Sequence, residues 1–322
     1  MFMDIILLIA GLILVLAGAN LMTDGSAAIA RRFGMSDFVV GLTVVSMMTS
    51  APELVVSITG AINASSEMAI GNIVGSNIFN ILVIIGIVAI IRPVKVEAGV
   101  LNNEIPLVVL SSVALFVIGL SPVLDNTPMT VTRVEGILLL LFFVIFMRYT
   151  FSTAKRHPGE NAQTADNLKR PMPFVRAVIY TLAGLGALIV GGQLFVDSAS
   201  EIARAIGWSE GLIGLTLLAA GTSLPELATS VVAAVKGFPG ICIGNVIGSN
   251  IFNIFFVLGL TSSITPLGFG SIGMADLSVL TVASILFWLF GRVYRKRTIT
   301  RAEGILMLSF YIAYIVWLYT GL

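Results

Sequence analysis

An internal repeat sets the architecture of this chain. Residues 18–93 align without a gap with residues 191–266, at a constant offset of 173 positions. Within them, the block IGNIVGSNIFNI at 70–81 returns as IGNVIGSNIFNI at 243–254. The chain is therefore built from two related copies, and each residue of one copy has an equivalent in the other.

Both copies consist mainly of apolar segments. The 322 residues are 57% hydrophobic and 11% charged, whereas soluble domains average about 25% charged residues. Runs close to the roughly 20 residues that a spanning helix needs predict an all-α polytopic membrane protein with ten transmembrane helices. The predicted helices cover 3–22, 38–62, 68–91, 104–121, 134–149, 174–195, 211–235, 241–264, 275–291 and 302–320.

A polar segment at 150–172 divides the chain into a first five-helix repeat at 1–149 and a second at 173–322. Because five is an odd number, the second copy is expected to enter the membrane from the opposite side. The sequence therefore predicts two inverted-topology repeats of five helices. In such folds the substrate site lies near the bilayer midplane, on interrupted helices.

The basic residues predict the orientation. With the N-terminus outside, 16 of the 18 Lys and Arg residues fall in inner loops, and only Arg133 and Arg204 fall outside. The positive-inside rule favours this arrangement. We expect a multi-pass protein of the cell (inner) membrane, with both termini outside and the 150–172 loop in the cytoplasm.

Each copy places one carboxylate inside an apolar run. Glu53 and Glu226 follow Pro52 and Pro225 in the matching motifs TSAPE and TSLPE. A charge at membrane depth costs from roughly 3 kcal/mol upward, so these glutamates point to a bound cation or proton. Each proline removes an N–H and should free the carbonyl four residues earlier. At helical spacing, the residues sharing a face with the glutamates are Ser46, Thr49, Ser50 and Ser57, and in the second copy Ala219, Thr222, Ser223 and Ser230.

The repeated asparagine block adds a second polar stripe at i, i+4 and i+8. Its members are Asn72, Ser76 and Asn80, and in the second copy Asn245, Ser249 and Asn253. Interhelical hydrogen bonding and site lining are equally good readings of Ser57, Ser230, Asn72 and Asn245. Asn77 and Asn250 lie off the stripe and are expected to cap or bridge helices. Gly71, Gly75, Gly244 and Gly248 are expected to permit close helix packing.

Oxygen donors of this kind suit Ca²⁺ and Na⁺ and are poor ligands for zinc or copper. The two glutamates carry −2, which one Ca²⁺, two Na⁺ or two protons would neutralise. A site that must be neutralised before it crosses the bilayer gives obligatory exchange. The sequence therefore predicts a transporter and not an enzyme, with no cofactor. The net charge of +1 gives no case for nucleic acid, and the expected partners are the ions and the lipid bilayer, without an obligate protein partner.

The paired GTSxPE-like and GNxxGSNxxN segments resemble the α-repeats of the calcium/cation antiporter superfamily, of the prokaryotic sodium/calcium exchanger type. The resemblance implies a Ca²⁺ site surrounded by Na⁺ sites, with the first and sixth helices as a sliding gate. Two positions depart from the family pattern: Met48 replaces a glycine, and Asn253 stands where some relatives have aspartate. The implied metal ligands are Thr49, Ser50, Glu53, Ser76, Asn80, Thr222, Ser223, Glu226, Ser249 and Asn253, with the backbone carbonyls of Ser46 and Ala219.

Taken together, these features predict a secondary antiporter that works by alternating access and exports Ca²⁺ in exchange for Na⁺. An H⁺/Ca²⁺ antiporter is the alternative within the same class, because two protons neutralise the same two glutamates. A cation channel is the alternative from another class, although channels usually build their pores from symmetric rings or carbonyl filters.

Overall fold

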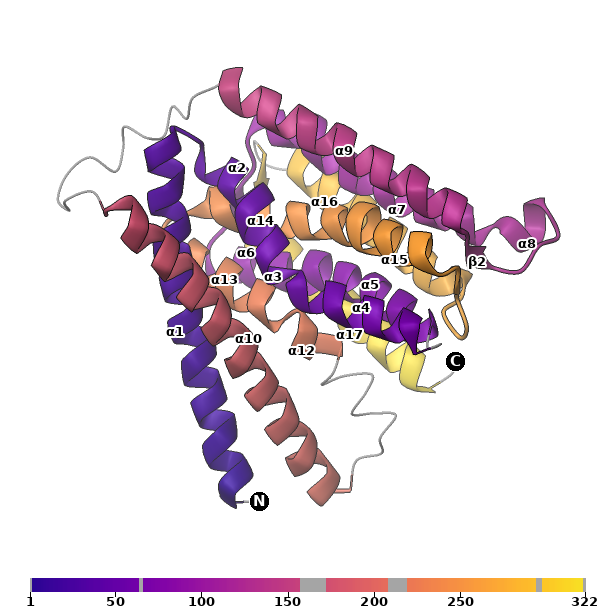
Figure 1. The fold of residues 1–322 in the computed structure, drawn as a ribbon, viewed down its shortest axis with the longest axis horizontal. Coiled ribbons are helices and arrows are strands. Elements are labelled where there is room, and N and C mark those ends of the chain that lie inside the picture. The colour runs from indigo at the N-terminus through magenta and orange to yellow at the C-terminus, as the bar shows by residue number, and fades with distance from the viewer. Residues whose placement is uncertain (1, 64–65, 157–171, 208–218, 294–296, 321–322) are drawn as a thin grey trace. The chain divides into compact units, whose positions relative to one another are not determined.

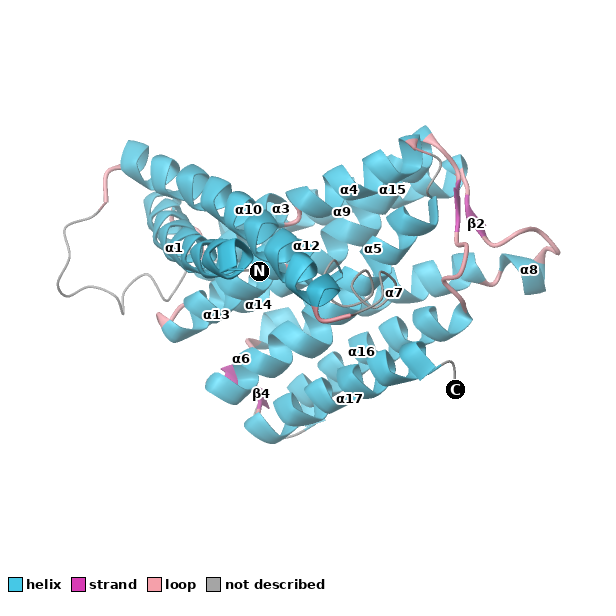
Figure 2. Cartoon of the chain, turned by 90° about the horizontal axis from the view of Figure 1, so that it is seen from below, coloured by secondary structure: helices cyan, strands magenta, loops and turns pink. Residues whose placement is uncertain are grey.

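The computed structural model describes residues 2–63, 66–156, 172–207, 219–293 and 297–320. These residues are almost entirely helical, and the strands form two short ribbons (Figure 2). The chain divides into two compact units. Unit 1 combines 1–49 with 152–245, and unit 2 combines 50–151 with 246–322. Each unit thus takes segments from both copies of the repeat.

Unit 1 is organised around two 32-residue helices, α1 and α10, that pack along each other (Figure 1). Glycines permit this approach, since a Cβ added to Gly18 would lie 2.8 Å from the carbonyl oxygen of Gly184. Helix α13 also packs on α1. The helices of unit 1 are α1 (Phe2–Phe33), α2 (Asp37–Val40), the π-helix η1 (Gly41–Val45), α3 (Ser46–Thr49), α10 (Phe174–Ala205), α12 (Ala219–Thr222), α13 (Leu224–Val235) and the first half of α14 (Pro239–Ile251).

Helices α1 and α10 extend well beyond the predicted spans 3–22 and 174–195. The apolar run of the first copy ends at Thr23, but Thr23, Ser26 and neighbouring alanines are fully buried. Contact with other helices, rather than with lipid, therefore accommodates these small polar residues. Hydropathy alone marked the helix end too early.

Unit 2 holds the remaining helices and both ribbons. Helix α4 packs on α5, α7 on α16 and α6 on α17, and the ribbons pair Val94 with Ile299 and Val131 with Leu267. The elements are α4 (Ala51–Ile62), α5 (Ser66–Phe79), η2 (Asn80–Ile84), α6 (Ile85–Ile91), β1 (Val94–Lys95), η3 (Val100–Glu104), α7 (Ile105–Gly119), α8 (Ser121–Leu124), β2 (Thr130–Val131), α9 (Arg133–Arg156) as far as Phe151, the second half of α14, η6 (Phe252–Leu258), α15 (Gly259–Ile264), β3 (Leu267–Gly268), α16 (Met274–Val293), β4 (Thr298–Ile299) and α17 (Arg301–Thr320).

Equivalent positions of the repeat make equivalent contacts within unit 2. A Cβ added to Gly86 would lie 3.1 Å from the carbonyl oxygen of Gly304, and a Cβ added to Gly259 would lie 3.0 Å from that of Gly136. Gly86 and Gly259 are separated by the repeat offset of 173. The sequence repeat is therefore matched by repeated packing.

The described residues contain eight helices that are long and apolar enough to cross a membrane, or nine if one bent pair forms a single span. This matches a polytopic membrane protein. Ten helices were predicted, and part of the predicted 211–235 helix lies outside the described residues, as does 157–171 of the predicted loop. The spans Ser66–Ile91 and Pro239–Ile264 are the most enclosed, with 83% and 94% of the residues in their most apolar windows buried. They carry the repeated asparagine block.

Each copy contains an interrupted helix at its Pro-Glu motif. In the first copy α3 ends at Thr49 and α4 begins at Ala51. In the second copy α12 ends at Thr222 and α13 begins at Leu224. The residue at each break has nearly the same backbone angles, φ −83° and ψ 10° for Ser50, and φ −89° and ψ 7° for Ser223. Proline breaks the helical hydrogen-bond ladder but fits the first turn of the helix that follows.

Candidate cation-binding site

A polar cluster in unit 2 is built around Glu53. This residue lies in the first turn of α4 and is fully buried. The Ser76 hydroxyl on α5 donates a hydrogen bond to Glu53 Oε1 at 3.4 Å. The partial positive charge at the start of a helix favours a carboxylate there. The helix break at Ser50 therefore places a helix N-terminus next to the Glu53 carboxylate. An uninterrupted helix would have no such positive end at this position.

Asn72 joins α5 to α4 beside this carboxylate. Its Nδ2 donates to Ser57 Oγ at 3.2 Å and to the backbone oxygen of Glu53 at 3.3 Å. The second copy repeats both contacts in unit 1, where Asn245 Nδ2 donates to Ser230 Oγ at 3.0 Å and to the backbone oxygen of Glu226 at 3.4 Å. These four side chains thus form interhelical hydrogen bonds, one of the two roles that the sequence left open.

A polar cluster in unit 1 is built around Glu226, which is fully buried in the first turn of α13. The Thr49 hydroxyl at the end of α3 lies 3.1 Å from Asn245 Oδ1 and 3.3 Å from the backbone oxygen of Ser46, and donates to these acceptors. Asn245 therefore uses its amide nitrogen to hold the glutamate helix and its oxygen to hold the threonine of α3.

Several of the predicted ligands carry buried polar atoms without a protein hydrogen-bond partner among the described residues. These atoms are Asn80 Oδ1 and Nδ2, the Ser249 hydroxyl oxygen and Asn253 Oδ1. Buried polar groups in folded proteins are nearly always hydrogen-bonded, so exceptions of this kind need an explanation. Cation coordination would explain the three oxygens among these atoms, because a cation ligand must keep a lone pair available; it does not explain Asn80 Nδ2, which can only donate. The donor set thus fits a hard cation such as Ca²⁺ or Na⁺.

The twelve predicted ligands divide equally between the units. Unit 1 holds Ser46, Thr49, Ala219, Thr222, Ser223 and Glu226, and unit 2 holds Ser50, Glu53, Ser76, Asn80, Ser249 and Asn253. Within each unit the structure gathers polar side chains around one glutamate.

The two copies differ at the position of Gly221. A Cβ on Gly221 would overlap the Val196 side chain, so glycine allows α12 to approach α10 within unit 1. In the first copy these two positions are Met48 and Thr23. Packing therefore accounts for the glycine of the second copy.

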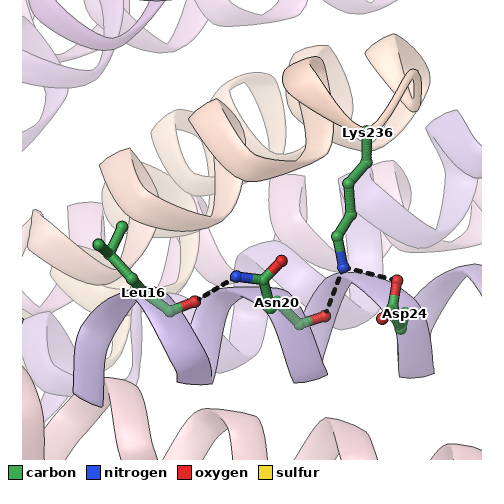
Figure 3. Close-up of polar contacts among 4 residues, drawn as sticks. All are labelled: Leu16, Asn20, Asp24 and Lys236. Atoms are coloured by element: carbon green, nitrogen blue, oxygen red, sulfur yellow. Dashed lines mark hydrogen bonds and ion pairs between the residues drawn. The ribbon is translucent and has the colours of Figure 1, made fainter. Parts of the chain in front are cut away.

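The sequence did not predict an ion pair at the far end of α13. Lys236 Nζ lies 2.7 Å from Asp24 Oδ1 and donates to the backbone oxygen of Asn20 at 3.2 Å, tying α13 to α1 (Figure 3). The equivalent positions in the other copy, Asn63 and Asp197, cannot form such a pair. One sequence signal could have indicated the ion pair: Lys236 is basic, whereas its equivalent in the first copy, Asn63, is neutral.

We expect this ion pair to contribute little to stability. The Lys236 and Asp24 side chains are 26% and 45% exposed, and pairs open to water contribute about 0–1 kcal/mol. A double-mutant cycle with Lys236→Ala and Asp24→Ala, read by thermal unfolding in detergent, should give a coupling within that range, decreasing as salt is added. A coupling above about 2 kcal/mol would show that water does not reach the pair.

The chain matches a known family over nearly its full length. The family described as sodium/calcium exchanger protein matches residues 3–152 and 176–320. The chain is 37% identical over 322 residues to the putative antiporter CaxA of Alkalimonas amylolytica, with 98% of each chain covered. It is 30% identical over 346 residues to the sodium/calcium exchanger MaX1 of Methanosarcina acetivorans, again with 98% of each covered.

A solved structure has the same fold. The sodium–calcium exchanger NCX_Mj, soaked with Na⁺ and Ca²⁺, aligns with a TM-score of 0.83 and 34% sequence identity, covering 98% of each chain. These relatives are transporters, in agreement with the expectation that this chain is not an enzyme. The protein is therefore a multi-pass membrane protein that belongs to the sodium/calcium exchanger family.

Proposed function

We propose that this protein is an antiporter that exchanges Ca²⁺ for Na⁺ by alternating access, and that the Na⁺ gradient drives Ca²⁺ export. The observation that carries the proposal is the pair of fully buried glutamates, Glu53 and Glu226. Each lies in the first turn of a helix that restarts after a break, beside hydroxyl and carboxamide groups. The family relationship supports the same conclusion independently.

The proposed ligand set consists entirely of oxygen donors. It offers two carboxylates, two carboxamides, hydroxyls from both copies and the backbone carbonyls of Ser46 and Ala219. Ca²⁺ takes six to eight oxygen ligands at about 2.3–2.6 Å, so a subset is enough for one Ca²⁺. The remaining oxygens are available to Na⁺, which needs no protonatable group. This surplus of neutral oxygens favours Na⁺ over H⁺ as the counter-ion.

The proposed architecture is ten transmembrane helices in two inverted repeats. We place the protein in the cell (inner) membrane, with both termini outside and residues 150–172 in the cytoplasm. Repeated local structure supports the repeat: the breaks at Ser50 and Ser223 have matching backbone angles. The hydrogen bonds of Asn72 are also copied by Asn245. The distribution of basic residues supports the orientation.

Charge neutrality gives the proposed mechanism. With both glutamates ionised and no cation bound, the site carries −2, and a charge at membrane depth is costly. One Ca²⁺ removes this charge, and so do two Na⁺. The occupied forms therefore change their side of access more readily than the empty form, which couples the flux of one ion to that of the other.

Ca²⁺ flux in proteoliposomes tests this proposal. At clamped pH and clamped membrane potential, a Na⁺ gradient directed out of the vesicles should drive Ca²⁺ uptake in exchange for Na⁺ efflux. Collapsing that gradient should stop the uptake. Uptake that follows only a pH gradient would replace Na⁺ by H⁺ as the counter-ion. Ca²⁺ flux that needs no counter-ion would instead indicate a channel.

A further inference from the structure

A chain of carboxamides in unit 2 links one predicted ligand to a residue outside the ligand set. Asn253 Nδ2 donates to Asn77 Oδ1 at 3.1 Å. Asn77 Nδ2 in turn donates to the backbone oxygen of Asn250 at 3.3 Å. Asn77 lies on α5, whereas Asn253 is the second residue of η6. All three asparagines are buried.

This chain of contacts fixes which way each carboxamide faces. A backbone carbonyl can only accept a hydrogen bond, so Asn77 must present its NH₂ group to Asn250. Its oxygen then faces Asn253, which must answer with its own NH₂ group. Asn253 Oδ1 is consequently turned away from Asn77, and it has no hydrogen-bond partner among the described residues. The orientation originates at a backbone atom, which cannot turn over.

The equivalent pair of the repeat, Asn250 and Asn80, does not form this hydrogen bond in the described part of the chain. By the repeat, Asn80 corresponds to Asn253 and Asn250 to Asn77. Asn250 Nδ2 instead donates to the backbone oxygen of Val246 on its own helix, at 2.8 Å. Asn250 Oδ1 and both polar atoms of Asn80 have no hydrogen-bond partner in the described part of the chain. Only one of the two carboxamide ligands is thus held in a fixed orientation by the protein.

We propose that Asn77 is a positioning residue, which holds Asn253 with its Oδ1 available to the transported cation and its NH₂ group turned away. This inference rests on the proposed function and adds a residue to it. A carboxamide can bind a cation only through oxygen, and a turned-over Asn253 would direct a partial positive charge at the ion. Asn77 supplies the hydrogen bond that prevents this reversal.

Asn77→Leu should raise the half-saturating Ca²⁺ concentration by about tenfold or more, because Asn253 loses the hydrogen bond that keeps its oxygen available to the cation. The maximal exchange rate at saturating Ca²⁺ should stay within about threefold of wild type, because Asn253 can still bind once Ca²⁺ is abundant. Both quantities come from proteoliposome flux, and Ca²⁺-dependent thermal stabilisation in detergent provides a binding readout.

Asn250→Leu is the matched control. It removes a buried carboxamide at the equivalent position of the repeat, yet keeps the backbone oxygen that Asn77 uses. Its half-saturating concentration should change by less than about threefold, the range expected when a side chain bonded only within its own helix is lost. If Asn77→Leu does not insert into the membrane, Asn77→Ala removes the same two hydrogen bonds without adding bulk.

A double-mutant cycle separates positioning from packing. In an Asn253→Ala background, no carboxamide remains to be oriented, so Asn77→Leu should cause no further loss of Ca²⁺ affinity. An equal loss in both backgrounds would overturn the proposal, as would an unchanged half-saturating concentration in Asn77→Leu while wild type responds to Ca²⁺. If wild type itself shows no Ca²⁺-dependent stabilisation or exchange, the proposed function fails, and this inference fails with it.

Discussion

Glu53→Gln and Glu226→Gln should each reduce Na⁺-driven Ca²⁺ exchange by at least about a hundredfold. Each replaces a buried carboxylate by a neutral group of the same shape, so the proposed site would carry −1 instead of −2. A glutamate and a bound Ca²⁺ form a buried pair of opposite charges, and removing one member of such a pair typically costs about 2–5 kcal/mol. A cost of about 3 kcal/mol corresponds to a hundredfold change. The measurement is the initial rate of Ca²⁺ uptake in proteoliposomes containing equal amounts of inserted protein.

Glu104→Gln provides a control with the same chemical change. Glu104 is also buried, at 6% exposure, and accepts a hydrogen bond from the Tyr149 hydroxyl at 3.1 Å. It lies outside the proposed ligand set, and glutamine can still accept that hydrogen bond. Exchange should therefore persist in this variant. Retention of more than about a tenth of the wild-type rate in Glu53→Gln or Glu226→Gln would remove that glutamate from the site.

The buried glutamates and the helix breaks beside them could be predicted from the sequence, because both depend on local features. A carboxylate inside an apolar run is anomalous in any membrane helix. The neighbouring Pro52 predicts the helix break, which the structure shows at Ser50. The repeat then transfers both conclusions to Glu226 without further assumptions. Residue type and helical spacing were sufficient here, because no contact between distant segments was needed.

The arrangement of the asparagines could not be predicted in the same way. Spacing placed Asn77 off the polar stripe, and it does bridge helices, but spacing does not identify its partners Asn250 and Asn253. Helical phase is also disturbed locally, because Asn80 begins one π-helix and Asn253 lies in another. A π-turn adds a residue and rotates the faces that follow. The i, i+4 spacing therefore does not predict which residues share a helix face near Asn80 and Asn253.

Glycine provides the other example. The sequence assigned close packing to all four glycines of the repeated block. In the described residues a Cβ on Gly75 would meet nothing within 4 Å, and on Gly71 it would make an ordinary contact of 3.4 Å with Ile272. On Gly244 it would overlap the backbone of α2 and η1. Equivalent positions of a repeat can thus differ in packing, because each faces a different neighbour.

Gly244→Ala should consequently be severely destabilising. The added Cβ would lie 2.7 Å from the backbone nitrogen of Leu42 and would also overlap the carbonyl oxygen of Phe38. Backbone atoms cannot rotate away as a side chain can, so helix α14 must shift at a cost of about 1–3 kcal/mol or more. Asn245 follows directly and would lose its hydrogen bond with Thr49. We expect a lower unfolding temperature in detergent and a weaker Ca²⁺ response.

Gly71→Ala is the internal control for this prediction, since Gly71 is the equivalent of Gly244 in the first copy. Its added Cβ would make only the ordinary contact with Ile272. The same substitution also favours the helix by up to about 1 kcal/mol, because alanine loses less conformational freedom than glycine. Gly71→Ala should therefore unfold at or above the wild-type temperature. Equal unfolding temperatures for the two variants would contradict the close approach of α14 to α2 and η1.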